Sequence, residues 1–457
     1  MSRVDAVIRG RRVVLPDGER PAAIHVANGV IVAITELGGA PAGVPTLDAG
    51  DACIMPGLVD THVHINEPGR TEWEGFETAT RAAAAGGVTT LVDMPLNSIP
   101  PTTTLEGLRA KVRALEAKAR VDVALCGGLV PSNSGPGGGI RELFDEGVLA
   151  FKCFLAESGV AEFSHVHELE LRAGMIEIAK VGAPLFVHAE LPEPLSEGER
   201  AALGLDPRKY DTYLRSRPRT AENAAVELVL RLAKETGCRA HIVHLSSSDA
   251  LTTFRRAREA KVPLSVETCP HYLTFASEEI PDGDTSFKCA PPIRESENRD
   301  KLWEALREGL VDQVVTDHSP SSAAMKCSGS GDFMKAWGGI SSLQIGLSAV
   351  WTGARARGAT VRDMARWMSE APARLAGLTG RKGAIAIGCD ADLAFWDPDA
   401  EHTIDAATLE HRHKITPYAG RALRGAILRT ILRGATIYER GTGFVGPPSG
   451  RWTRRAI

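Results

Sequence analysis

The sequence has no Cys-x-x-Cys pair, no apolar run of membrane-spanning length and no large excess of either charge. Its eight cysteines are scattered over 457 residues, and several lie in apolar stretches, as Cys153 does in Phe-Lys-Cys-Phe. We expect buried, reduced thiols in a cytosolic protein rather than a disulfide framework. The net charge of −4 mixes both signs, so we expect no nucleic-acid partner and no basic membrane-binding face.

Targeting and phosphate-binding signals are also missing. The first ten residues contain no signal-peptide apolar core, and charges interrupt every long apolar stretch. The sequence therefore predicts a cytoplasmic location and no membrane partner. The glycine run at residues 132–139 lacks the Gly-Lys-Ser/Thr of a phosphate loop, and we interpret it as a mobile loop after a strand.

The texture of the sequence changes near residue 56 and again near residue 382. The segments outside these points carry short strand-like runs separated by Gly and Asp-Gly turns, and we expect separate strands at residues 5–9, 12–15 and 384–387 among others. Between them, apolar runs alternate with Ala-, Leu-, Arg- and Glu-rich helical stretches, which is the pattern of a parallel sheet. There are eight such runs, at residues 57–64, 89–94, 121–125, 148–154, 183–188, 239–244, 263–268 and 312–317.

These patterns predict the fold class and the domains. Eight strands with intervening helices favour a (β/α)8 TIM barrel over residues 56–382. The short strands of residues 1–55 and 383–457 predict a small β-sandwich domain built from both chain ends. Two unrelated flanking segments are the alternative interpretation. The long polar insertion between residues 191 and 223 is expected to act as a lid or an oligomer contact.

Polar residues alternate along the first barrel run. Asp60, His62 and His64 stand at every second position, so a strand presents their side chains on one face. Two imidazoles and a carboxylate are poor core residues but good ligands for a divalent metal. Asp60 lies deeper along the strand, and we expect it to orient the rings of the two histidines rather than to bind metal.

Four more candidate ligands follow later runs. Lys152 ends the fourth run, His188 the fifth, His244 the sixth and Asp317 the eighth. Active sites of (β/α)8 barrels lie at the C-terminal ends of the strands, so we expect these residues to meet at one rim. Any one of them alone is more simply interpreted as structural.

The remaining histidines carry weaker signals. His241 precedes His244 by three positions, so we expect it to face the opposite way, into the layer between strands and helices. His271 and His318 lie near the expected rim, where supporting and purely structural roles are both open.

Lys152 is the unusual member, because an ammonium cannot bind a metal. A lysine amine that has reacted with carbon dioxide becomes a carbamate, whose two oxygens can bridge two cations. Two divalent ions bring a charge of about +4, which Asp317, a hydroxide and a carbamate reduce to about +1, whereas a protonated lysine leaves about +3. We therefore predict that Lys152 is modified to N6-carboxylysine.

Two motifs resemble the cyclic-amide branch of the amidohydrolase superfamily. One is Pro56-Gly-Leu-Val-Asp-x-His-x-His-x-x-Glu-Pro-Gly69, and the other is Gly383-Ala-Ile-Ala-Ile-Gly-Cys-Asp-Ala-Asp-Leu393. The resemblance covers essentially the whole chain. It implies two divalent metal ions, most simply zinc, with cobalt, manganese or nickel also suitable. It also implies a homotetramer.

The resemblance implies which residues hold each ion. One metal would be bound by His62, His64, Lys152 and Asp317. The other would be bound by Lys152, His188 and His244. A hydroxide bridging the two metals would attack a ring carbonyl. Asp317 would accept its proton and pass it to the leaving ring nitrogen.

Within the branch, three stretches are most similar to the enzymes that open the ring of allantoin to give allantoate. They are residues 66–75, 267–272 and 334–340. The resemblance implies allantoin as the small-molecule substrate. The implied substrate contacts are Asn66, Cys289, Trp337, Gly338 and Gly339, with core packing as the alternative role of Trp337.

Departures from sister families bear on the substrate. Dihydroorotases usually carry Arg at the position of Asn66, where it holds the substrate carboxylate, and a neutral amide suits a ureido group better. Hydantoinases and dihydropyrimidinases usually carry Tyr at the position of Glu157. Arg70 could take the role of the missing arginine, so the dihydroorotase interpretation is weakened but not removed. The alternative function is a dihydroorotase or a hydantoinase/dihydropyrimidinase acting on a related cyclic amide. A scaffold protein that has lost its metal ligands is disfavoured, because every ligand position is filled.

Overall fold

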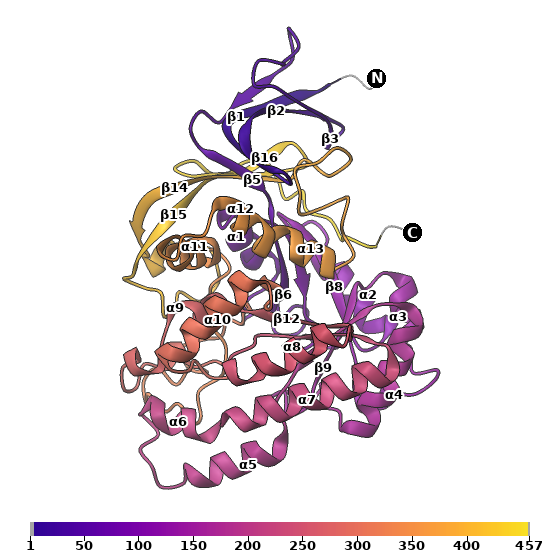
Figure 1. The fold of residues 1–457 in the computed structure, drawn as a ribbon, viewed down its shortest axis with the longest axis vertical. Helices are drawn as coiled ribbons and strands as arrows, with labels where there is room; N and C mark the ends of the chain where they lie inside the picture. The colour runs from indigo at the N-terminus through magenta and orange to yellow at the C-terminus, as the bar shows by residue number, and fades with distance from the viewer. Residues whose placement is uncertain (1–3, 456–457) are drawn as a thin grey trace.

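A computed structural model describes residues 4–455 and contains two β-sheets. One is a mixed sheet of nine strands, and the other is a parallel sheet of eight strands. Figure 1 shows the nine-stranded sheet at one end of the molecule and helices α5 (Pro192–Ala201) and α6 (Tyr210–Ser216) at the other. No helix among residues 4–455 is both long and apolar enough to cross a membrane.

The eight parallel strands follow one another in chain order around their sheet. They are β6 (Leu58–Val63), β7 (Val88–Asp93), β8 (Asp122–Gly128), β9 (Ala150–Phe154), β10 (Pro184–His188), β11 (Arg239–Ile242), β12 (Leu264–Thr268) and β13 (Gln313–Val314). Each predicted apolar run overlaps one of these strands. A parallel bridge between Val63 and His318 brings the two edges of the sheet together, which is consistent with a (β/α)8 barrel.

Helices connect the strands and turn apolar faces toward the sheet. In α7 (Arg219–Thr236), the buried residues Val226, Val229 and Ala233 recur at helical spacing. The others are α1 (Phe76–Ala85), α2 (Leu105–Leu115), α3 (Ile140–Glu146), α4 (Glu168–Val181), α8 (Leu251–Glu259), α9 (Pro270–Thr274), α10 (Ser296–Glu308), α11 (Gly346–Ala356), α12 (Val361–Ala365) and α13 (Ala371–Leu375). Both faces of the parallel sheet are therefore buried, which explains the nearly continuous apolar runs.

Strands from both chain ends share the nine-stranded sheet. The N-terminal segment supplies β1 (Ala6–Leu15), β2 (Gly18–Ala27), β3 (Val30–Thr35), β4 (Thr46–Asp48) and β5 (Cys53–Pro56). The C-terminal segment supplies β14 (Leu393–Thr403), β15 (Ala422–Leu432), β16 (Ala435–Glu439) and β17 (Gly443–Phe444). The two groups join where β5 pairs antiparallel with β14, with Ile54 opposite Phe395. The predicted sandwich architecture and domain boundaries stay predictions.

Two details of this region differ from the sequence-based expectation. The runs at residues 5–9 and 12–15 were expected to be separate strands, but they form the single strand β1, because a register shift after Gly10 absorbs the expected turn. Residues 384–387 were expected to form a strand but do not. Gly383 and Gly388 flank them with φ of 82° and 92°, which bends the chain before it can pair.

A buried cluster of charges joins the two sheets. The Lys382 Nζ lies 2.7 Å from Asp122, the first residue of β8, and 2.5 Å from Asp392, just before β14. Arg433 donates to Asp122 at 2.6 Å. Because Asp122 begins its strand, this cluster lies at the end of the barrel opposite the C-terminal strand ends.

Candidate metal centre

All six predicted metal ligands line one cavity of about 230 Å³ at the C-terminal ends of the parallel strands. They are His62 in β6, His64 one residue beyond it, Lys152 in β9, His188 at the end of β10, His244 two residues beyond β11 and Asp317 three residues beyond β13. The structure thus brings together residues from five strands. Their role as ligands stays a prediction.

Three of these residues form one half of the centre. The Asp317 Oδ1 lies 3.2 Å from the His62 Nε2 and 3.4 Å from the His64 Nε2. One possible ligand atom from each lies within 4.8 Å of the others, which is close enough for one ion. Burial by itself would raise the pKa of Asp317, but the neighbouring histidines outweigh it and hold that pKa well below the ordinary value.

His188 and His244 form the other half. The His188 Nδ1 lies 3.0 Å from the His244 Nε2, so two ring nitrogens converge on one point. Burial lowers the pKa of both rings, which favours the neutral form that binds metals. The set of imidazoles and one carboxylate in a buried cavity therefore fits divalent metal ions.

Backbone strain marks two of the ligand positions. His244 and Asp317 have φ of 41° and 44°, in the left-handed region that residues with a Cβ rarely adopt. Both follow short strands, and the left-handed turn re-aims each side chain after the regular alternation has ended. Such strain is typical of functional sites, where the surrounding structure holds it in place.

The Lys152 amine is fully buried, and among residues 4–455 its Nζ has no hydrogen-bond partner. Burial lowers the pKa of Lys152 to about 8. A neutral amine is the form that reacts with carbon dioxide, and an unpaired buried nitrogen is costly unless something binds it. This environment supports the predicted carbamate.

Known proteins with this fold and sequence point to one family. A model described as the amidohydrolase family matches residues 53–437. The chain belongs to the amidohydrolase family. It is 51% identical to an allantoinase of Streptomyces avermitilis over 456 residues, which cover 100% of both chains. It is 42% identical to an allantoinase of Arabidopsis thaliana over 448 residues, covering 95% of this chain and 88% of that one.

A solved structure supports the same assignment of the fold. The L-hydantoinase (dihydropyrimidinase) from Arthrobacter aurescens matches with a TM-score of 0.93 at 32% identity, covering 99% of this chain and 100% of that one. The fold of this amidohydrolase is therefore shared over its whole length with an enzyme named for cyclic amides.

A buried carboxylate that the sequence reasoning missed orients His62, one of the predicted ligands. Glu267 lies 2.6 Å from the His62 Nδ1 and 2.9 Å from the His241 Nε2. The bond to Nδ1 leaves the Nε2 of His62 free to bind metal. The expectation for His241 was wrong, because its side chain turns into the barrel toward Glu267. The left-handed backbone of His244 explains why counting residues back from it failed.

Asp60 was expected to orient the histidine rings, and that role is wrong. One of its oxygens accepts from the backbone N–H of His62 at 3.1 Å. The other accepts from the Thr316 hydroxyl at 2.6 Å and the Thr316 N–H at 3.1 Å. Asp60 therefore ties the backbone of β6 to the segment that carries Asp317.

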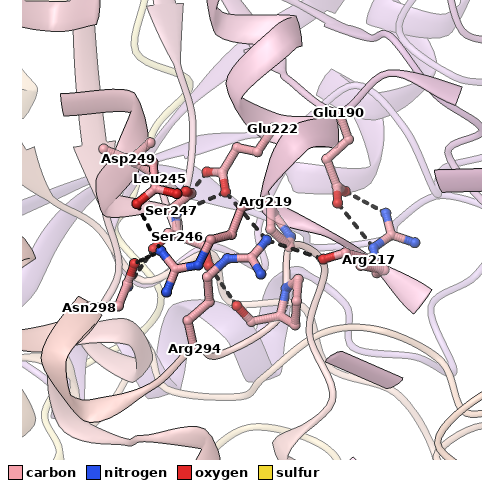
Figure 2. A network of polar contacts seen from close by, with 12 residues as sticks. Glu190, Arg217, Arg219, Glu222, Leu245, Ser246, Ser247, Asp249, Arg294 and Asn298 are labelled. Carbon is pink, nitrogen blue, oxygen red and sulfur yellow. Dashed lines mark hydrogen bonds and ion pairs between the residues drawn. The ribbon is translucent and has the colours of Figure 1, made fainter. Parts of the chain in front are cut away.

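A second missed carboxylate holds His188. The Glu190 Oε2 lies 2.7 Å from the His188 Nε2, which leaves Nδ1 as the ring nitrogen available to a metal. Arg217, from the segment between α6 and α7, donates to Glu190 at 3.1 Å and also lines the cavity (Figure 2). Only the His-x-Glu spacing could have indicated Glu190, because the partner arginine comes from the long insertion.

Figure 2 also shows how α7 holds the segment after His244. The Glu222 carboxylate accepts from the backbone N–H groups of Ser246 and Ser247, both at 2.8 Å. Arg294 donates to the Arg217 carbonyl at 3.2 Å, so the same network reaches the loop after residue 288. The insertion between residues 191 and 223 thus supports the site, and its lid or oligomer role stays a prediction.

The predicted substrate contacts divide into two groups. Trp337, Gly338 and Gly339 line the cavity, whereas Asn66 and Cys289 are not among its lining residues. Lys288 and Ala290, on either side of Cys289, do line it. The ring of Trp337 also packs edge-on against Trp73, with the ring centroids 5.1 Å apart, but both residues are only half-buried and neither belongs to the apolar core.

Other residues complete the wall, and sequence reasoning gave them no role as contacts. Among them are the polar residues Asn97, Tyr213, Arg217 and Lys288, together with Glu157, which the sequence singled out for another reason. The side-chain oxygen of Asn97 is buried and has no hydrogen-bond partner among the described residues. Arg70 does not line the cavity; it donates to Glu162 at 3.0 Å and to the Asn97 carbonyl at 3.3 Å.

Proposed function

We propose that this amidohydrolase opens the ring of allantoin by hydrolysis to give allantoate. The observation that carries the proposal is one cavity that brings six residues together. They are the cluster of His62, His64 and Asp317, the two further histidines His188 and His244, and the buried Lys152, whose Nζ has no hydrogen-bond partner among residues 4–455. Identity of 51% over the whole length to an enzyme named allantoinase supports the choice of substrate. The activity belongs to the cyclic amide hydrolases.

The ligand set accommodates two divalent ions. His62, His64, Lys152 and Asp317 would hold one, and Lys152, His188 and His244 the other, with Lys152 carboxylated by carbon dioxide. Zinc is our first choice, with cobalt, manganese and nickel as alternatives that the same ligands suit. Such ions supply a hydroxide near neutral pH and polarise the carbonyl of the substrate.

Asp317 moves the proton. Its carboxylate is ionised, since the surrounding histidines keep its pKa low, so it can accept the proton of the attacking water. As the carbon–oxygen bond forms and the ring carbon–nitrogen bond breaks, Asp317 returns that proton to the leaving nitrogen. The products are the ring-opened ureide and its new carboxylate.

The walls of the cavity bear on selectivity. Arg70 is held by Glu162 and lies outside the cavity lining, so it does not supply the carboxylate-binding arginine that a dihydroorotase needs. Glu157 lines the cavity where hydantoinases usually carry Tyr. Main-chain groups near Cys289 and in the Trp337–Gly339 loop would hold the amide edges of allantoin, whereas Asn66 lies outside the cavity lining and is not proposed as a direct contact.

A substrate panel tests the proposal. The metal- and bicarbonate-loaded protein is assayed with allantoin, dihydroorotate, hydantoin and dihydrouracil, and allantoin is expected to have the highest kcat/KM. A clear preference for dihydroorotate or hydantoin would overturn the assignment. Absence of bound metal together with absence of hydrolysis would favour a scaffold protein.

We also propose a homotetramer in the cytoplasm. The resemblance to the cyclic-amide branch and the composition of the sequence support these two points. Native mass measurement is expected to give four times the mass of one chain, and a monomer would contradict it. Fractionation of cells is expected to place the protein with cytoplasmic markers.

A further inference from the structure

Lys326 is a buried lysine that the proposed mechanism does not use. Only 3% of the residue is exposed, and both acceptors that its Nζ reaches are neutral main-chain carbonyls. It donates to the Lys288 carbonyl at 2.9 Å and to the Gly339 carbonyl. Burial lowers the pKa of Lys326 to about 7, and a buried polar nitrogen costs free energy unless it is hydrogen-bonded.

The two carbonyls belong to the two segments that form one wall of the cavity. Lys288, Ala290, Gly338 and Gly339 all line that cavity. The Gly339 N–H also donates to the Lys288 carbonyl at 2.9 Å. The Lys288 carbonyl oxygen therefore accepts two hydrogen bonds, one from Gly339 and one from Lys326. The two segments are therefore joined directly by the Gly339–Lys288 hydrogen bond and also through Lys326, which donates to both of them.

The orientation of these carbonyls sets the orientation of the next N–H groups. In a trans peptide group, the C=O and the following N–H point in opposite directions. With the Lys288 carbonyl turned toward Lys326, the N–H of Cys289 is turned away from it. Likewise, the Gly339 carbonyl is turned toward Lys326, and the N–H of Ile340 is turned away from it. Main-chain groups form well-aligned hydrogen bonds with an amide substrate when their directions are fixed in advance.

The segment that carries Lys326 is itself tied to the same wall. The Trp337 N–H donates to the Met325 carbonyl at 2.7 Å. Gly339 has φ of 142°, and a Cβ built on it would lie 2.4 Å from the Ser319 carbonyl oxygen, so the loop packs too closely for a side chain there.

We propose that Lys326 is a positioning residue that sets the spacing and direction of the main-chain groups which hold the substrate amide. The inference rests on the proposed function, because it names what positions the substrate in that same site. Lys326 acts through the backbone of residues 288–290 and 337–340, and it does not touch the reacting atoms.

Two variants of the full-length, metal-loaded protein test it. Lys326→Met removes both donors at nearly constant length, and kcat/KM for allantoin is expected to fall at least about tenfold, mainly through a higher KM. Lys326→Gln keeps an amide donor and is expected to recover part of that loss. Bound metal per chain should equal that of the wild type in both variants.

Hydrogen exchange gives a readout that does not depend on hydrolysis. In Lys326→Met, the amides of residues 288–290 and 337–340 are expected to exchange faster, while those of the barrel strands do not. A wild-type protein that fails to open allantoin would contradict the proposed function, but the exchange result would still decide the role of Lys326.

Lys382→Gln is the matched control, since Lys382 is equally buried but lies at the opposite end of the barrel. It is expected to lower thermal stability without changing KM or the exchange of the two loops. The proposal is overturned if Lys326→Met keeps KM within about twofold and leaves loop exchange unchanged. It is also overturned if Lys382→Gln raises KM equally, because the effect would then reflect general destabilisation.

Discussion

Two buried carboxylates hold two of the histidines that we propose as metal ligands. Glu267 contacts His62, and Glu190 contacts His188. Burial by itself would raise the pKa of each carboxyl, but the histidine partners and Arg217 outweigh it and lower both values to about 2. Both groups are therefore charged at every pH where the protein is expected to work.

Glu267→Gln removes the charge beside His62 and weakens the preference for the Nδ1 tautomer. We expect metal affinity to fall by about 10- to 100-fold, because partners of ligating histidines typically contribute that much. Competition with a chelator measures it. Glu297→Gln, on an exposed face of α10, serves as the control and should not change affinity. Equal affinity in both variants would mean that Glu267 has no orienting role.

Lys152→Ala tests the carbamate bridge. We expect the variant to bind fewer than two metal ions per chain and to lose nearly all turnover, because both ions would share the missing oxygens. Metal analysis and the allantoin assay measure this, and the intact mass of the wild type should exceed the sequence mass by one carbon dioxide. A variant with two metals and normal turnover would rule out the bridge.

Among the individual residues of the cavity, the sequence predicted those near strand ends and missed those that come from insertions. His62, His64, Lys152 and His188 follow from strand alternation and strand ends. Asn97 and Arg217 lie in loops whose path depends on tertiary contacts. Glu267 was visible in the sequence, but only the structure shows that its side chain reaches the rings of two histidines.

Among the elements, α7 and the segment after β11 depend on a single carboxylate. Glu222 on α7 caps the N–H groups of Ser246 and Ser247, two and three residues after His244. Burial raises the pKa of Glu222 to about 7, although Arg294 and these N–H groups oppose the rise. The ionisation of Glu222 is therefore coupled to the segment that follows His244, a proposed metal ligand.

Glu222→Gln removes this titration. A carboxyl whose pKa is raised on folding stabilises the native state below its ordinary value of 4.5, and loses that contribution as pH rises through about 7. The wild type should therefore lose stability relative to the variant between about pH 5 and about pH 8, by on the order of 3 kcal/mol. Denaturant midpoints at the two pH values measure it, and parallel curves would contradict it.

The strands of the barrel were predictable because each is buried on both faces and reads as an apolar run. The terminal sheet was harder, since its pairing depends on partners far away in the sequence. Nothing local shows that residues 5–9 and 12–15 continue through Gly10 as one strand. Residues 384–387 have strand-like composition, but Ile385 is buried in the apolar core of the sheet without joining a strand.

For the whole molecule, the buried charges around Lys382 fasten the barrel to the terminal sheet. Lys382→Gln leaves Asp392 and Asp122 with less compensation, so we expect a loss of about 3 to 5 kcal/mol in the free energy of unfolding. The site lies at the other end of the strands, so kcat/KM for allantoin should not change. Denaturant unfolding and steady-state assays measure the two effects, and a parallel loss of activity would contradict this separation.

The pairing of β5 with β14 has a consequence for synthesis on the ribosome. Roughly 340 residues separate these two neighbours, so β5 leaves the ribosome long before its partner exists. At about 5–20 residues per second, the wait lasts roughly 20 to 70 s. During that time β1, β2 and β3 can pair with one another, but the edge that later receives β14 stays open and prone to wrong pairing. The strands of the barrel lie between β5 and β14 in the chain, so their synthesis is part of this delay. The nascent chain is therefore most exposed to wrong pairing at its first strands.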